Sequence, residues 1–276
     1  MKSTSIGLTV FCIGLAAISL VLTGNSDAQL DIEGAVAIWL FDEGRGDKVA
    51  DASGNGNDGE FVNNPEWVEG KFGDALDFDG IVDYVQINVP VVVETDDFTM
   101  GCWVNPGKVQ KQWANILSSH GGDPGPPINC EGMSFEQNSD TPNRFYFIGG
   151  GAPRQCWLGQ AAQTQLKSGV WQHFVVVRKD GKLTHYLDGE VSAEVGLPQD
   201  LAVATDRFRI ANWSRHGNRE FQGKVDEAMV FSRALSHDEI TTAMNEGIAE
   251  ILPVSPVDKA LTTTWGTLKW MNRRRE

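Results

Sequence analysis

The chain has 276 residues, of which 41% are hydrophobic and 9% aromatic, enough for one large domain with a sizeable core. The formal net charge is −14, from 37 acidic and 23 basic residues, which argues against nucleic acid or an anionic membrane as the partner. An acidic, soluble surface and a cation-binding protein are both compatible with this charge.

The first 28 residues have the pattern of a secretory signal peptide. Lys2 supplies the positive start, residues 6–22 form an apolar run, and the small residues in 26–28 place cleavage before Gln29. An uncleaved membrane anchor is the alternative, because the run is near the lower length limit for a span. Cleavage would make the mature protein secreted, extracellular or periplasmic.

Three cysteines remain after the signal, in an oxidising setting. Cys130 and Cys156 both lie in polar, loop-rich segments, so we predict that they form a disulfide. Cys102 lies in an apolar strand pattern and is expected to be a buried free thiol. No spacing of cysteine and histidine fits a zinc site.

The mature chain alternates short apolar runs with turns rich in Gly, Asn and Asp. We expect strands at 35–41, 75–79, 84–87, 98–104, 112–118, 132–136, 144–149, 171–178, 183–189, 190–193, 207–211 and 223–231, and loops at 120–131 and 150–157. Asp180-Gly181 and Asp188-Gly189 are typical of tight hairpin turns. Many short strands joined by such turns predict an all-β antiparallel sandwich or barrel.

One helix follows the strands. Ser236 and Glu239 form a capping-box pattern, with serine at the N-cap and glutamate three residues later. Apolar residues then recur at helical spacing, at Ile240, Ala243, Met244 and Ile248, which predicts a short helix near 236–247. We expect residues 251–276 to be a flexible or loosely docked tail.

Two acidic segments are candidate cation sites. In Ala75–Val85, Leu76 and Phe78 share one face of the expected strand, and Asp79 precedes a turn at Gly80. Residues 51–59 offer carboxylate, amide and carbonyl oxygens, which are the ligands that calcium takes. Solvated polar residues and an ordinary loop are the alternatives.

Several motifs in order resemble the laminin G-like jelly rolls of the concanavalin A-like lectin/glucanase superfamily, in their secreted bacterial form. They are 39–44, 51–56, 73–80, 83–85, 98–104, 171–174, 186–189, 221–227 and 232–240. The resemblance runs from about Gly34 to Gly247, within an expected domain at 29–250. It implies two facing antiparallel sheets, a jelly-roll β-sandwich, whose first and last strands are adjacent.

The resemblance also implies a structural calcium at the sheet edge. Matching residue by residue, the candidate ligands are Asp42, Asp51, Asp79 and Asp226. The adjacency of first and last strands would bring Asp42 close to Asp226.

The residues argue against catalysis. Glycoside hydrolysis needs two carboxyl groups that flank the scissile bond. Glu131 and Glu136 are five residues apart and would point to opposite faces of an ideal strand. No Ser-His-Asp arrangement stands out. The chain is therefore predicted not to be an enzyme, with a glycoside hydrolase as the less favoured alternative.

A carbohydrate-binding module fits the residues better, because aromatic faces and planar polar side chains hold sugars. The candidate ligand-binding residues are Trp157, Trp213, Arg154 and Tyr146, with Trp113, Asn129 and His216 as further candidates. Trp39, Trp103 and Trp171 are expected in the core instead. An adhesion or scaffolding module that binds protein is the other alternative, since related folds use the same rim for both.

Overall fold

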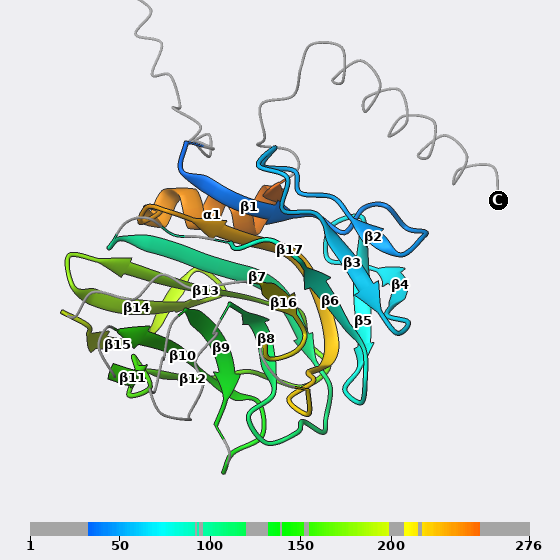
Figure 1. The fold of residues 1–276 in the computed structure, drawn as a ribbon. Coiled ribbons are helices and arrows are strands. Elements are labelled where there is room, and N and C mark those ends of the chain that lie inside the picture. Colours follow the sequence, from blue (N-terminus) through cyan, green and yellow to red (C-terminus); the bar gives the residue numbers. More distant parts are fainter. Residues whose placement is uncertain are drawn as a thin grey trace, which may run out of the picture.

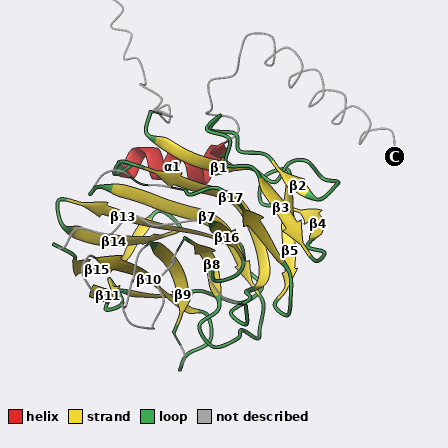
Figure 2. Ribbon diagram, viewed as in Figure 1, coloured by secondary structure: helices red, strands yellow, loops and turns green. Residues whose placement is uncertain are grey.

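The computed structural model describes residues 33–248, except 92, 94–95, 120–131, 139, 152–154, 199–206 and 215–216. These residues form two antiparallel sheets that face each other, with one short helix (Figures 1 and 2). The predicted all-β sandwich is confirmed.

One sheet has eight strands and is called sheet A; the other has nine strands and is called sheet B. Sheet A has the order β15-β14-β13-β7-β17-β5-β4, with β1 also paired to β17. Its strands are β1 (Ala35–Trp39), β4 (Glu66–Glu69), β5 (Asp74–Asp79), β7 (Phe98–Pro106), β13 (Gln172–Lys179), β14 (Lys182–Leu187), β15 (Glu190–Gly196) and β17 (Gln222–Phe231).

Sheet B has the order β11-β10-β9-β8-β16-β6-β3-β2, with β12 also paired to β10. Its strands are β2 (Lys48–Val49), β3 (Gly59–Val62), β6 (Tyr84–Ile87), β8 (Asn115–Ser118), β9 (Met133–Gln137), β10 (Arg144–Gly151), β11 (Gln155–Leu158), β12 (Gln163–Gln165) and β16 (Phe208–Ile210).

The core lies between the two sheets. Leu76 and Phe78 of β5 are buried in one apolar cluster with Phe135 of β9 and Phe147 of β10. Side chains alternate along a strand, so every second residue of these strands faces the other sheet. Burying each such side chain contributes about 1.5–3 kcal/mol to stability. The predicted inward face of β5 is confirmed.

The three tryptophans expected in the core differ from one another. Trp39 is fully buried in the main cluster. Trp103 is also buried, but it lies outside that cluster and its ring packs at a tilt against His173. Trp171 is only partly buried, so its assignment to the core is wrong.

The first and last strands of the domain are adjacent, as expected. β1 pairs antiparallel with β17, with Trp39 opposite Ala228. Figure 1 shows the two strands next to each other, with the helix close to both. Because Asp42 follows β1 and Asp226 lies in β17, this pairing brings the ends of the domain together.

Two of the predicted hairpin turns are confirmed. Asp180 and Gly181 have φ values of 49° and 72°, and Asp188 and Gly189 have values of 52° and 82°. Positive φ at both central residues defines the type I′ turn, whose twist matches that of paired strands. These turns join β13, β14 and β15 at one edge of sheet A.

Some predicted strand boundaries are wrong for a local reason. Phe41 and Trp113 each have a φ of 58°, which a regular strand does not allow. Strand β1 therefore ends earlier than expected, at Trp39, and strand β8 begins later, at Asn115. The 150–157 segment was expected to be loop, but it contributes to β10 and β11. The described ends of this segment form strands because β10 pairs with β11, which local pattern does not reveal.

Helix α1 (His237–Glu246) begins with the predicted capping box. The Ser236 side chain accepts a hydrogen bond from the Glu239 backbone, and the Glu239 carboxylate accepts one from the Ser236 backbone. Ile240 and Ala243 are buried against Ile38 and other apolar residues of sheet A. The helix therefore covers part of the outer face of sheet A.

Several predictions fall outside the described residues. These are the signal peptide at 1–28, the tail at 251–276, Cys130 with the side chain of Cys156, and the candidate ligand-binding residues Arg154, Asn129 and His216. The predicted disulfide and the domain limits thus stay predictions. Cys102 is free and buried, as expected, and burial raises the pKa of its thiol.

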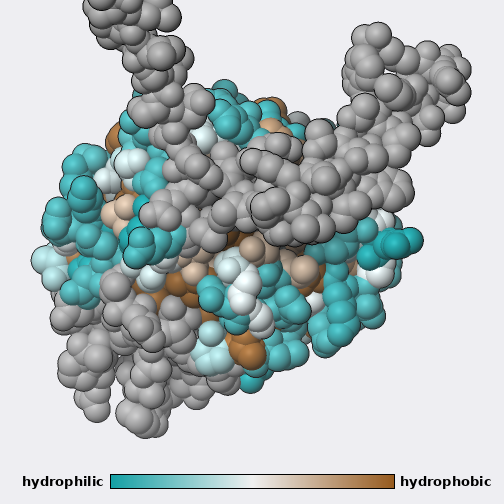
Figure 3. Space-filling model, turned by 90° about the horizontal axis from the view of Figure 1, so that it is seen from above, coloured by the Kyte–Doolittle hydropathy of each residue, from teal (hydrophilic) through white to brown (hydrophobic). Residues whose placement is uncertain are grey.

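Seen from above, the described surface is mostly hydrophilic with small hydrophobic areas (Figure 3). Within the described residues, no helix combines the length and the apolar character that a membrane span requires.

Candidate functional site on the outer face of sheet B

The outer face of sheet B carries an unusual cluster of polar and aromatic side chains. Phe135 and Phe147 point into the core. Glu136 and Tyr146 are their neighbours on β9 and β10, so strand alternation turns them to the outer face. The two strands pair with Tyr146 directly opposite Glu136.

Glu136 is the centre of this cluster. Its Oε1 accepts a hydrogen bond from the Tyr146 hydroxyl at 2.7 Å, and its Oε2 lies 2.5 Å from Nη1 of Arg219. Only 4% of the residue is exposed. Burial raises the pKa of its carboxyl above the ordinary value, although Arg219 and Tyr146 act in the opposite direction. The group is a buried acceptor held in one orientation.

Arg219 is held between two tryptophan rings. Its guanidinium lies 5.2 Å from the centre of the Trp113 ring and 4.1 Å from that of Trp213. Cation–π contacts of this kind fix a flexible side chain in place. Trp113 is 40% exposed, whereas Trp213 is buried. We call Glu136, Tyr146, Arg219, Trp113 and Trp213 the Glu136 face.

A second charge pair flanks the Glu136 face. Lys111 Nζ forms an ion pair with Glu220. Glu220 also accepts hydrogen bonds from Asn212 Nδ2 at 3.3 Å and from the Asn218 backbone at 2.9 Å. Burial would raise the pKa of Glu220, but these partners outweigh it and the pKa is lowered. Both carboxylates here are thus already matched with a cation.

The polar surface continues toward the other edge of sheet B. Arg209 of β16 stacks over the Tyr84 ring at 4.5 Å. Its Nε donates to Gln86 Oε1 at 2.9 Å, and its Nη1 donates to the carbonyl of Trp213 at 2.8 Å. Planar guanidinium and amide groups beside aromatic rings therefore extend over several strands.

Two of the predicted ligand-binding residues, Tyr146 and Trp213, belong to the Glu136 face. Trp157 is 59% exposed on β11, at the edge of the same sheet. Glu136 was considered only as a catalytic residue, and Arg219 was not considered at all. Alternation in Met133–Gln137 could have placed Glu136 outward, but no local signal brings Arg219 to it across 83 residues.

The four predicted calcium ligands do not form one cluster. Among the described residues, no three histidine, cysteine or acidic side chains are placed to hold a metal ion together. Asp51 accepts backbone hydrogen bonds from Ile38, Ser53 and Asn57. Its two oxygens thereby shape the 51–57 loop.

Asp79 has the same kind of role in the next turn. Its Oδ1 accepts hydrogen bonds from the backbone of Ile81, Val82 and Asp83 at 2.7–3.2 Å. Burial alone would raise its pKa, but these three donors lower it. This carboxylate is engaged in closing the Gly80 turn.

Asp42 and Asp226 are near enough for their carboxylates to interact electrostatically. The carboxylate of Asp42 raises the pKa of Asp226, which burial, the larger cause, brings to about 7. Asp226 Oδ2 accepts hydrogen bonds from the backbone of Lys71 and Phe72, while its buried Oδ1 has no hydrogen-bond partner among the described residues. An orphaned buried carboxylate oxygen beside a second carboxylate suits a cation, so this pair fits the predicted calcium better than Asp51 or Asp79.

The family model described as the concanavalin A-like lectin/glucanases superfamily, in its laminin G-like branch, matches residues 79–241. No curated protein sequence matches the chain.

Solved structures with a similar fold include domain 4 of AbnA, an extracellular arabinanase from Geobacillus stearothermophilus, in complex with arabinotriose. It has 17% identity and a TM-score of 0.57, over 76% of this chain and 98% of that domain. The binding domain of Paraclostridial Mosquitocidal Protein 1 has 12% identity and a TM-score of 0.62, over 78% of this chain and 52% of that one.

Trypanosoma rangeli sialidase in complex with sialic acid has 17% identity and a TM-score of 0.54, over 77% of this chain. This chain spans only 33% of the sialidase and about half of the mosquitocidal binding domain. At these identities the likeness shows a shared fold.

Proposed function

The chain belongs to the laminin G-like family of the concanavalin A-like lectin/glucanase superfamily, and we propose that it is a non-catalytic module that binds a neutral carbohydrate through the Glu136 face. One observation carries the proposal: the Arg219 guanidinium is fixed between the rings of Trp113 and Trp213 while it pairs with Glu136. Sugars are bound by such combinations of aromatic surface and oriented planar polar groups.

The charge pairs favour a neutral ligand. Arg219 and Lys111 are each matched with a carboxylate that is almost fully buried, Glu136 and Glu220 respectively. An acidic sugar could recruit either cation only by leaving a buried carboxylate unpaired, which is costly. Catalysis is disfavoured by the burial of both carboxylates, because a substrate has little access to either of them.

The solved structures support carbohydrate binding at the level of fold, and they include both a neutral sugar ligand and sialic acid, which is acidic. Domain 4 of AbnA holds arabinotriose, a neutral sugar, and covers nearly the same length as this domain. Export through the N-terminal segment is part of the proposal and rests on the sequence pattern.

The proposal is tested with a panel of neutral oligosaccharides (arabinotriose, xylotriose, cellotriose and mannotriose) and two acidic ones (sialyllactose and trigalacturonic acid). We expect at least one neutral compound to bind, and Trp113→Ala to weaken that binding at least tenfold without lowering the melting temperature. Trp67→Ala, which removes a partly buried tryptophan of sheet A, is the matched control. Binding of acidic sugars alone, or of none, would refute the proposal.

We further propose that Asp42 and Asp226 hold a calcium ion together with backbone carbonyls. A cation bound only to the folded state stabilises it by linkage. EDTA should therefore lower the melting temperature of the wild type, and calcium should restore it. Asp226→Asn should remove this response, whereas Asp51→Asn should keep it; an unchanged wild-type melting curve after thorough chelation would count against the ion.

A further inference from the structure

The outer face of sheet A contains a pocket that the Glu136 face does not involve. Its volume is about 580 Å³, and strands β4, β5, β7 and β17 form its floor. We name it the Lys224 pocket, after the residue at its centre; its polar lining includes Glu66, Asp77, Asn105, Lys108, Gln222 and Lys224. It lies on the opposite sheet of the sandwich from Glu136.

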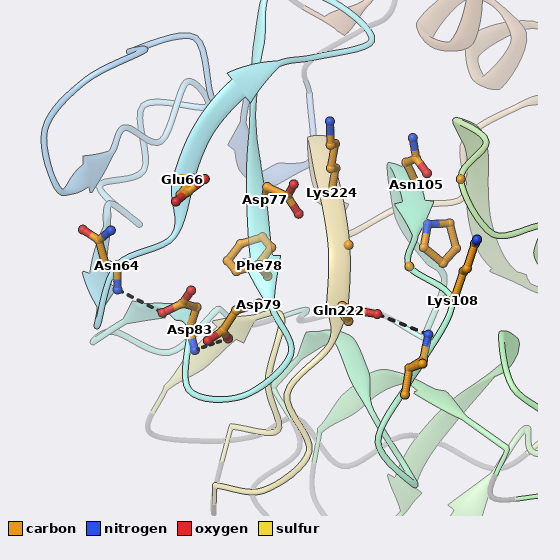
Figure 4. A pocket seen from close by; sticks show the side chains of 15 residues that line it. Asn64, Glu66, Asp77, Phe78, Asp79, Asp83, Asn105, Lys108, Gln222 and Lys224 are labelled. Carbon is orange, nitrogen blue, oxygen red and sulfur yellow. Dashed lines mark hydrogen bonds between the residues drawn. The ribbon is translucent and has the colours of Figure 1, made fainter.

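Four polar side chains cross this pocket in a row. Glu66 is directly opposite Asp77, Asp77 is opposite Lys224, and Lys224 is opposite Asn105. Their neighbours Leu76 and Val225 face the core, so the row points outward. Figure 4 shows Glu66, Asp77, Lys224 and Asn105 next to one another across the strands.

This row alternates in hydrogen-bonding character. Glu66 and Asp77 are acceptors only, Lys224 is a donor only, and the amide of Asn105 is both. Two carboxylates directly opposite each other on a sheet are unfavourable by themselves. A group that donates to both carboxylates while accepting from Lys224 would relieve this repulsion.

The walls of the pocket are held in place by the backbone. Asp83 Oδ1 accepts a hydrogen bond from the Asn64 backbone at 3.0 Å, and Asp79 closes the neighbouring turn. On the other side, Gln222 Oε1 accepts one from the Val109 backbone at 3.2 Å. Two of these bonds are drawn in Figure 4 beside the row. A ligand would thus meet an already ordered rim.

We propose that the Lys224 pocket is a second saccharide site, which binds the adjacent hydroxyl groups of a neutral sugar and makes the module bivalent. The inference rests on the carbohydrate-binding function proposed above. A hydroxyl donates one hydrogen bond and accepts others, so two adjacent hydroxyls can bridge Asp77 to Lys224 and Asn105. Neither a simple anion nor a simple cation matches a row that carries both charges.

The two sites differ in one respect that affects binding strength. Among the described residues that line the Lys224 pocket, Phe78 is the one aromatic residue, and its side chain is buried in the core. The pocket therefore lacks the stacking surface that Trp113 supplies on the Glu136 face. We expect weaker binding at the Lys224 pocket. This site would hold a second saccharide chain, or a second part of the saccharide chain bound at the Glu136 face.

The experiment compares three proteins by calorimetric titration with the neutral trisaccharide that binds best. The wild type should bind two molecules, one at least fivefold more weakly than the other. Asp77→Leu/Lys224→Met, which removes both partners together, should bind one. Lys182→Met/Glu194→Leu changes another acid–base pair on sheet A in the same way and should still bind two.

Each outcome has a distinct meaning. Loss of only the weaker site in Asp77→Leu/Lys224→Met supports the second site. A wild type that binds one molecule, with binding removed by Trp113→Ala and unchanged by the pocket variant, overturns the second site and leaves the proposed function intact. No binding to any neutral saccharide overturns both.

A second readout covers a pocket variant that folds poorly. A multivalent conjugate of the same trisaccharide on albumin should be precipitated by the wild type. Lys224→Met alone should bind the conjugate without precipitating it, because one site cannot cross-link. Precipitation equal to that of the wild type by Lys224→Met would contradict bivalency.

Discussion

At the residue scale, aspartates and glycines shape the loops that surround both sheets. Asp51 and Asp79 each accept several hydrogen bonds from backbone N–H groups. In these loops the carboxylates replace the backbone acceptors that a paired strand would provide. Gly73 has a φ of 57° and lies against the carboxylate of Asp42. The contact leaves no room for a side chain at this position.

Gly73→Ala should therefore destabilise the protein more than Gly54→Ala. Both glycines have positive φ, so both variants pay for backbone strain of about 1–2 kcal/mol. At Gly54 nothing lies within 4 Å of an added Cβ, whereas at Gly73 the Cβ would overlap Asp42 Oδ1. Urea denaturation measures the difference; equal losses would show that the loop at Gly73 can shift freely.

At the element scale, strand alternation and one helix cap set the positions of whole surfaces. The β9 and β10 strands turn phenylalanines inward and Glu136 with Tyr146 outward. Helix α1 covers the apolar end of the outer face of sheet A. The polar end of that face stays open, and the Lys224 pocket lies there.

Ser236→Ala should lower the free energy of unfolding by about 1 kcal/mol, and Ser236→Gly by only a few tenths. The serine hydroxyl accepts the Glu239 backbone hydrogen bond, and glycine lets water reach that donor. Chemical denaturation of the two variants beside the wild type gives both values. A larger loss in the glycine variant would mean that the cap has another role.

At the scale of the whole molecule, buried titratable groups couple folding to pH. Burial lowers the pKa of His185 to about 4 and that of His173 to about 3. Asp226 acts in the opposite direction, because its pKa is raised to about 7. Compared with the unfolded chain, the folded protein binds protons more weakly at His173 and His185 and more strongly at Asp226.

The pH dependence of stability should become shallower in His185→Gln. An unfolded histidine takes up a proton as the pH falls below about 6.5, whereas folded His185 does so only near pH 4. Its contribution to stability is full above pH 6.5 and is lost as the pH falls toward 4. Between these values, unfolding of the variant takes up about one proton fewer than unfolding of the wild type. The slope of the free energy of unfolding against pH should therefore be smaller by about 1.4 kcal/mol per pH unit. Parallel wild-type and variant curves, measured by denaturation at several pH values, would refute this.

Much of the fold could be predicted because it follows from local pattern. The Asp-Gly turns, the capping box at Ser236, and the alternation of Leu76 and Phe78 with Asp77 and Asp79 each depend on residues near in sequence. The errors arose where one residue takes a positive φ, as at Phe41 and Trp113, or where a strand forms only by pairing, as at β11.

The sequence by itself determined the class of fold, the adjacency of the first and last strands through family resemblance, and the presence of tryptophan, tyrosine and carboxylate candidates. The tertiary structure alone decided which of them meet. Arg219 reaches Glu136 and Trp113, and Asp77 lies opposite Lys224, only because strands distant in sequence pair in one register. Contacts of this kind depend on strand order across the sheets, which no local pattern of residues specifies.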